Sequence, residues 1–194
     1  MQRGSGMSTV ERQPATIDDL YKVEGKAELV GGEIVKMSPS GFWHMRINFV
    51  ILSSLKRYES DTGQGYAFGD GGGFLCDLPG RKSFSPDCSY YTGHLPRSGH
   101  QFLPEPPLFA VEIRSENDYG PRAEKAMADK RADYFAAGTK AVWDVDPEGP
   151  VFVRLYLSEN PEAAIEFHSG EVAHAGAVLP GWELPVDEIR DELK

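Results

Sequence analysis

Apolar and polar positions along the chain fall into patterns that predict strands and helices in turn. Residues 27–37, AELVGGEIVKM, hold two short apolar runs around Gly31 and Gly32. This predicts a β-hairpin, because glycine accepts the positive φ of a two-residue turn. Residues 42–60 instead repeat apolar positions at i, i+3 and i+4, the spacing of an amphipathic helix. That repeat runs through His44, Ile47, Ile51, Leu55 and Tyr58.

The second half of the chain continues the series. Residues 108–115, LFAVEIRS, have the composition of a buried strand. A helix is expected from Pro121, a favourable first helical position, to Gly138, a favourable helix end. Residues 69–73, GDGGG, are expected to form a hairpin loop, since they lack the strand-to-helix setting of a phosphate-binding loop. Further strands are expected at residues 140–147, 151–158 and 163–169.

This order of elements predicts an α+β fold with an α/β-type mixed sheet. We expect a central mixed β-sheet flanked by helices, with an N-terminal β-hairpin and a short helical turn after Thr16. No internal repeat or long linker divides the chain. Residues 16–194 are therefore expected to form a single domain that follows a flexible segment, residues 1–15.

Composition narrows the class of protein. The 194 residues are 40% hydrophobic and 26% charged, as in a globular protein with one core. The net charge of -10 argues against a broad basic surface for nucleic acid, although it allows a local basic cleft or a metal ion. Cys76 and Cys88 form no zinc or disulfide pattern. With no membrane-length apolar run and no secretory signal, we expect a cytoplasmic protein that binds no membrane.

Glu112 is the first residue that a purely structural interpretation does not explain. It interrupts the buried strand at residues 108–115, where an ionised carboxylate is costly unless it is paired. Asp87 follows Pro86 at an expected strand start, 25 positions earlier, so the two strands could lie side by side. Two neighbouring carboxylates suit Mg²⁺, which prefers oxygen ligands. The backbone carbonyl of Ile113 could add a third ligand.

Lys130 is the second such residue. It lies in an otherwise apolar stripe of the helix expected from Pro121, whereas Lys125 lies on the opposite face. A lysine in a buried stripe either extends to water or meets a negative group, and Glu112 is the nearest candidate. The stripe consists of Ala123, Ala126, Met127, Lys130, Tyr134 and Ala137.

These residues also carry a resemblance to a known family. The segments SPD, VEIRS and DKRADYFAAGTKAVWDVDP, together with AELVGGEIV and His44, resemble the Uma-type family of restriction endonuclease-like proteins, within the PD-(D/E)xK nuclease superfamily. The resemblance covers about residues 16–185. Asp87 matches the first acid, Glu112 the second and Lys130 the lysine. Arg114 stands where the short form of the motif has its lysine, so the amine would have moved to the helix.

The resemblance implies a metal-dependent endonuclease that hydrolyses phosphodiester bonds, with DNA as the first candidate substrate. Mg²⁺ or Mn²⁺ would bind Asp87, Glu112 and the Ile113 carbonyl, and Lys130 would position water or stabilise negative charge. The auxiliary residues would be Glu28, Glu33, His44 and Arg114. A homodimer is the default assembly.

Two other functions remain open on the sequence alone. The chain could be a catalytically inactive nuclease-fold module for binding or regulation, as Arg114 and the acidic net charge suggest. It could also be a homodimeric scaffold for a protein partner. In either case Asp87 would cap a turn, Glu112 would belong to a structural ion pair, and Glu28 or Glu33 would be an exposed hairpin carboxylate. Whether Glu28 or Glu33 faces the site is left open by the alternation of the hairpin.

Overall fold

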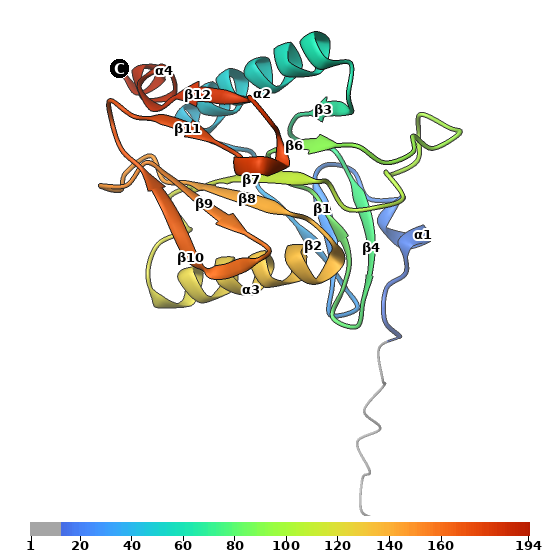
Figure 1. Ribbon diagram of the computed structural model, residues 1–194. Helices are drawn as coiled ribbons and strands as arrows, with labels where there is room; N and C mark the ends of the chain where they lie inside the picture. Colours follow the sequence, from blue (N-terminus) through green and yellow to red (C-terminus); the bar gives the residue numbers. More distant parts are fainter. Residues whose placement is uncertain (1–12) are drawn as a thin grey trace, which may run out of the picture.

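A six-stranded sheet forms the centre of the protein, as the computed structural model of residues 13–194 shows (Figure 1). Residues 1–12 of the segment expected to be flexible lie outside the described residues. The strand order is β10-β9-β8-β7-β6-β3. β7 and β8 are parallel and the other neighbours antiparallel, so the predicted mixed sheet is confirmed. The strands are β3 (Tyr66–Phe68), β6 (Cys88–Tyr91), β7 (Phe109–Ile113), β8 (Ala141–Val145), β9 (Val153–Leu157) and β10 (Asn160–Phe167).

A smaller sheet, ordered β2-β1-β5-β4, lies beside the central one. Its first two strands form the predicted hairpin, in which Val30 pairs with Glu33 across Gly31 and Gly32. Both glycines have positive φ, 59° and 76°, as the two-residue turn requires. Thr16 caps the short helix α1 (Ile17–Leu20), as predicted. The strands are β1 (Ala27–Val30), β2 (Glu33–Lys36), β4 (Phe74–Leu78) and β5 (Arg81–Phe84).

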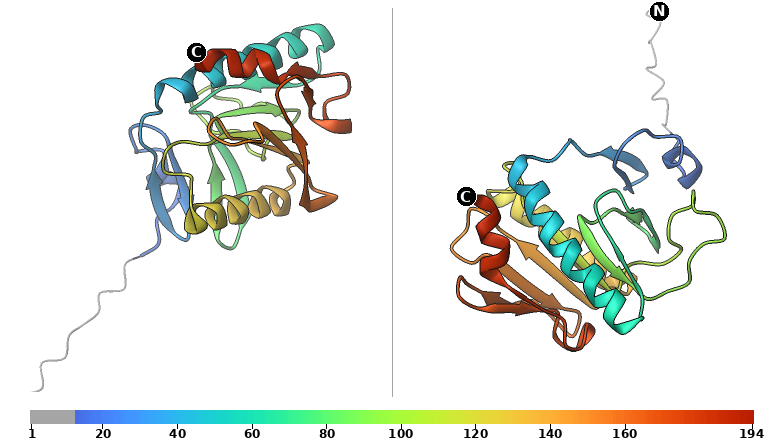
Figure 2. Two further views of the ribbon diagram at one scale, coloured as in Figure 1. Left: turned by 90° about the vertical axis from the view of Figure 1, so that its left-hand side faces the viewer. Right: turned by 90° about the horizontal axis from the view of Figure 1, so that it is seen from above.

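Two long helices cover opposite faces of the central sheet (Figures 1 and 2). α2 (Phe42–Thr62) buries the predicted apolar stripe against odd-numbered residues of β7, including Phe109 and Val111. α3 (Pro121–Ala137) connects β7 to β8 and begins and ends where the sequence predicts. Its Tyr134 packs with Ala110 on the other face of β7. The alternation of β7 therefore directs Glu112 towards α3.

The C-terminal segment adds elements that the sequence pattern did not predict. It pairs two short strands and continues into a helix that packs against α2. Trp182 from this segment lies 4.9 Å, centroid to centroid, from Trp143 in the core. These elements are β11 (Val172–His174), η1 (Gly176–Val178), β12 (Glu183–Pro185), α4 (Val186–Arg190) and η2 (Asp191–Leu193). Within residues 13–194, no helix has the length and apolar character needed to cross a membrane.

Candidate active site

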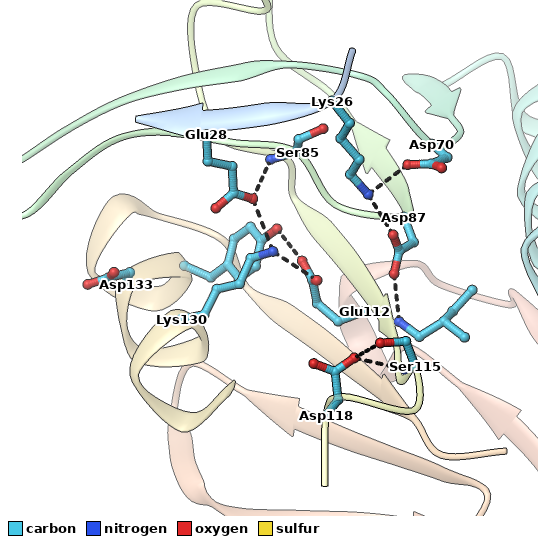
Figure 3. A network of polar contacts seen from close by, with 12 residues as sticks. Lys26, Glu28, Asp70, Ser85, Asp87, Glu112, Ser115, Asp118, Lys130 and Asp133 are labelled. Atoms are coloured by element: carbon cyan, nitrogen blue, oxygen red, sulfur yellow. Dashed lines mark hydrogen bonds and ion pairs between the residues drawn. The ribbon is translucent and has the colours of Figure 1, made fainter. Parts of the chain in front are cut away.

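Asp87 lies directly before β6, beside Glu112 on the neighbouring strand β7. Its backbone N–H donates to the carbonyl of Val111, which fixes it at the end of the β6–β7 pairing. The carboxylate is buried and accepts from the Ile113 N–H at 2.8 Å and from His44 Nε2 at 3.0 Å. Lys26 Nζ lies 2.7 Å from its other oxygen (Figure 3). Burial would raise the pKa of Asp87, but the His44 hydrogen bond and the Lys26 charge outweigh it, so the pKa lies well below its usual range.

Both carboxylate oxygens of Glu112 have hydrogen-bond partners. Lys130 Nζ donates to Oε2 at 2.9 Å and the Tyr134 hydroxyl donates to Oε1 at 2.7 Å. Both partners come from α3, one turn apart, so the helix supplies the pairing that the strand lacks. Burial raises the pKa of Glu112, and the charge of Asp87 raises it further. The charge of Lys130 lowers it, but the pKa of Glu112 remains above its usual value. The carboxylates of Glu112 and Asp87 are thus close enough to influence each other electrostatically.

Lys130 lies between two carboxylates rather than beside one. Its ammonium group is 3.0 Å from Glu28 Oε1 as well as 2.9 Å from Glu112 Oε2. Burial would lower the pKa of Lys130, but Glu112 and Glu28 raise it above its ordinary value. The amine is therefore held as a cation, which suits it to stabilise negative charge and not to accept a proton.

Glu28, and not Glu33, is the hairpin carboxylate that joins this network. Glu28 is buried, accepts from the Ser85 N–H at 2.9 Å and pairs with Arg81 of β5. Burial would raise the pKa of Glu28, but Lys130 and Arg81 lower it below the usual value. The structure does not bring Glu33 into this network. Glu33 directly follows the hairpin turn and its side chain is exposed, because β1 alone of the two strands packs against β5.

Arg114 forms ion pairs that the sequence did not predict. Its guanidinium binds Asp144 of β8 through two hydrogen bonds of 2.8 Å, and it also pairs with Glu124 of α3. Only 6% of the side chain is exposed. The hydrogen-bonding edge of Arg114, which the sequence suggested as an auxiliary residue of the site, is thus occupied by carboxylates, and the side chain ties β7 to β8 and α3.

A groove of about 900 Å³ runs past these side chains. Residues 37–44 and 112–119 line most of it, and Lys26, Asp87 and Lys130 border it as well. A ligand that enters this groove can therefore reach Asp87, Glu112 and Lys130 together.

The side chains of the candidate site determine whether it could hold the metal ion that the sequence suggests. Among residues 13–194, no group of three or more His, Cys, Asp or Glu side chains is arranged to hold a metal ion. Two neighbouring carboxylates of the site, Asp87 and Glu112, line the groove. That number suits Mg²⁺, which usually takes one or two protein carboxylates and keeps several waters. The ammonium groups of Lys26 and Lys130 already lie against these carboxylates, so the site accommodates positive charge. The residues present therefore fit a partly hydrated magnesium or manganese ion.

Comparison with known proteins decides the family. The sequence matches the Uma2 family, described as "Putative restriction endonuclease", over residues 15–187. The chain belongs to this family. A crystal structure of a protein from Anabaena variabilis, described as "a putative nuclease belonging to DUF820", has the same fold, with a TM-score of 0.73. The match covers 93% of this chain and 100% of that one at 18% sequence identity. No curated protein matches the chain.

Two residues of this Uma2 chain, Lys26 and Asp70, belong to the site although the sequence pattern did not single them out. Lys26 bridges Asp87 and Asp70, with Nζ–O distances of 2.7 Å and 2.6 Å. Asp70 belongs to the glycine-rich loop, whose position depends on the fold of the smaller sheet (Figure 3). The signal that could have found Lys26 is its place one residue before β1, two positions from Glu28 and on the same side of the extended chain.

Proposed function

We propose that this protein is a metal-dependent endonuclease that hydrolyses phosphodiester bonds of DNA. The observation that carries the proposal is the convergence of Asp87 and Glu112 from neighbouring strands with Lys130 from α3 at one open groove. Membership of the Uma2 family and the likeness to a structure described as a nuclease support it.

Asp87, Glu112 and the carbonyl of Ile113 would hold Mg²⁺ or Mn²⁺. Such an ion polarises a phosphoryl oxygen and lowers the pKa of a bound water. Ile113 N–H and His44 hold the Asp87 carboxylate in one orientation. Lys130, kept protonated by Glu112 and Glu28, would stabilise the negative charge that develops on the phosphoryl group.

The test uses purified protein with supercoiled plasmid, and separately with single-stranded circular DNA, in Mg²⁺ or in Mn²⁺. Nicking or linearisation is expected from wild type, and its loss is expected in chelator and in Asp87→Asn, Glu112→Gln and Lys130→Met. Glu33→Gln is the matched control, because it removes a hairpin carboxylate that faces solvent. Absence of cleavage of both DNAs in both metals, or equal cleavage by Asp87→Asn and wild type, would refute the proposal.

A catalytically inactive nuclease-fold module for binding or regulation is the second candidate. It is favoured by one observation: both carboxylates already have lysine partners, at 2.7 Å for Asp87 and 2.9 Å for Glu112. Calorimetric titration with Mn²⁺ separates the two candidates. Binding that is lost in Asp87→Asn supports the nuclease, and no binding to wild type supports the module.

A further inference from the structure

Two aromatic side chains at the start of α2 are exposed on the groove that holds the candidate site. Phe42 is 60% exposed and Trp43 is 44% exposed. The other two tryptophans of the chain, Trp143 and Trp182, are buried at 0% and 3% exposure. Phe42 and Trp43 line the same groove as Asp87. They are therefore adjacent to the proposed chemistry and contribute little to the core.

The geometry of α2 explains why these rings remain outside. His44, Ile47 and Ile51 form the buried face of the helix, and Phe42 and Trp43 precede that face at the first turn. His44, the next residue along, donates to Asp87 at 3.0 Å. The first turn of α2 therefore places the exposed rings of Phe42 and Trp43 next to His44, which orients the Asp87 carboxylate.

The charges of the groove leave little attraction for a phosphate backbone. Among the described residues that line it, Lys26 and Lys130 are each paired with two carboxylates and Arg114 with three. The whole chain carries a net charge of -10. Binding to a duplex depends largely on cationic contacts with phosphates, and these are scarce here. Base stacking on aromatic side chains is a contribution separate from those cationic contacts, and it needs bases whose faces are uncovered.

We propose that the groove binds single-stranded nucleic acid by stacking its bases on Phe42 and Trp43, which brings the adjoining phosphodiester to Asp87 and Glu112. The inference rests on the proposed function, since it names the form of nucleic acid that the same site takes. A duplex covers its base faces and can offer the rings only its edges and its backbone. Single-stranded segments, frayed ends and loops are therefore the preferred substrates.

The test measures binding apart from cleavage. Wild-type protein in Ca²⁺ is titrated with a twelve-residue oligothymidylate, and separately with a duplex of the same length, while tryptophan fluorescence is recorded. Trp43 is the exposed one of the three tryptophans, so stacking is expected to quench its emission. The single strand is expected to bind at least about tenfold more tightly than the duplex. Phe42→Ala and Trp43→Ala are each expected to weaken single-strand binding by about 5-fold to 100-fold.

Phe49→Ala is the matched control. Phe49 is 67% exposed on the same helix but does not line the groove, so its removal is expected to leave the affinity unchanged. Trp43→Phe keeps an aromatic face and is expected to retain most of the affinity while losing the fluorescence signal. Equal effects of Phe42→Ala and Phe49→Ala, or equal affinity for single strand and duplex, would overturn the inference.

Two further results separate this inference from the proposed function. Quenching and aromatic-dependent binding without any cleavage in Mn²⁺ would refute the nuclease and support the single-strand site. Cleavage of duplex plasmid that is unaffected by Phe42→Ala and Trp43→Ala would support the nuclease and overturn the inference. Sedimentation tests whether a second copy of the chain covers Phe42 and Trp43 instead. If Phe42→Ala and Trp43→Ala both convert a dimer to a monomer and keep their affinity for the single strand, the inference is refuted.

Discussion

Replacing Arg114 with alanine should destabilise the protein far more than the loss of an ordinary surface charge would. The guanidinium is 6% exposed and holds Asp144, whose side chain is 3% exposed, through two hydrogen bonds of 2.8 Å. Asp144 lies in β8 directly opposite Glu112 of β7, so the pair connects the two parallel strands at the centre of the sheet. Alanine removes the cation and leaves a buried carboxylate without that partner.

The expected loss follows from that geometry. Breaking a buried ion pair by removing one partner costs about 3–5 kcal/mol, a large part of the 5–15 kcal/mol typical of a whole domain. For a chain of this size, each kcal/mol lowers the melting temperature by about 2–4 °C, so the shift should be about 6–20 °C.

Urea unfolding followed by circular dichroism measures this loss of stability directly. Lys125→Ala serves as a control, because Lys125 pairs with Asp129 on the exposed face of α3 and should cost about 0.5 kcal/mol or less. Arg114→Met combined with Asp144→Leu removes both charges and should recover most of the stability. A loss below about 1 kcal/mol in Arg114→Ala would refute the structural role of Arg114.

Three other outcomes test the network around the proposed site. Glu33→Gln should change the free energy of unfolding by less than about 0.5 kcal/mol and leave Mn²⁺ binding unaltered in calorimetry, since Glu33 is exposed. Tyr134→Phe should cost about 1–3 kcal/mol in urea unfolding, because the buried hydroxyl donates to Glu112 at 2.7 Å; an unchanged midpoint would contradict this. Lys26→Met should tighten Mn²⁺ binding several-fold in the same calorimetric assay, because the ammonium no longer competes for Asp87. Weaker binding by that variant would show that the lysine assists the ion.

The sequence was sufficient for the central part of the fold because the signals there are local or nearly so. Alternation in residues 108–115 assigned Glu112 to the face opposite Phe109 and Val111, and the structure confirms it. Asp87 directly precedes β6, and one loop joins β6 to β7. The two strands can therefore pair side by side, as they do. The helical stripe placed Lys130 towards the sheet, and the pairing of its ammonium with Glu112 follows from that placement.

The parts that could not be predicted depend on contacts between distant segments. Whether Glu28 or Glu33 faces the site is decided by which hairpin strand pairs with β5, and Arg81 of that strand is far away in sequence. The role of Asp70 depends on where the smaller sheet holds its glycine-rich loop. The C-terminal strands are three residues each, too short to show a period of two.

Stability and the proposed chemistry make opposite demands on the carboxylates of this groove. A buried carboxylate needs a cation nearby in the folded protein, whereas one that binds a metal ion must be able to exchange that partner. The structure uses different residues for the two demands. Arg114 forms a two-pronged pair with Asp144, which lies opposite Glu112 in β8, while Lys26 and Lys130 hold Asp87 and Glu112. A lysine presents one charge on a flexible stem and can withdraw without breaking a fixed geometry. Lysine partners therefore allow these two carboxylates to be neutralised in the resting protein and still be available to an ion.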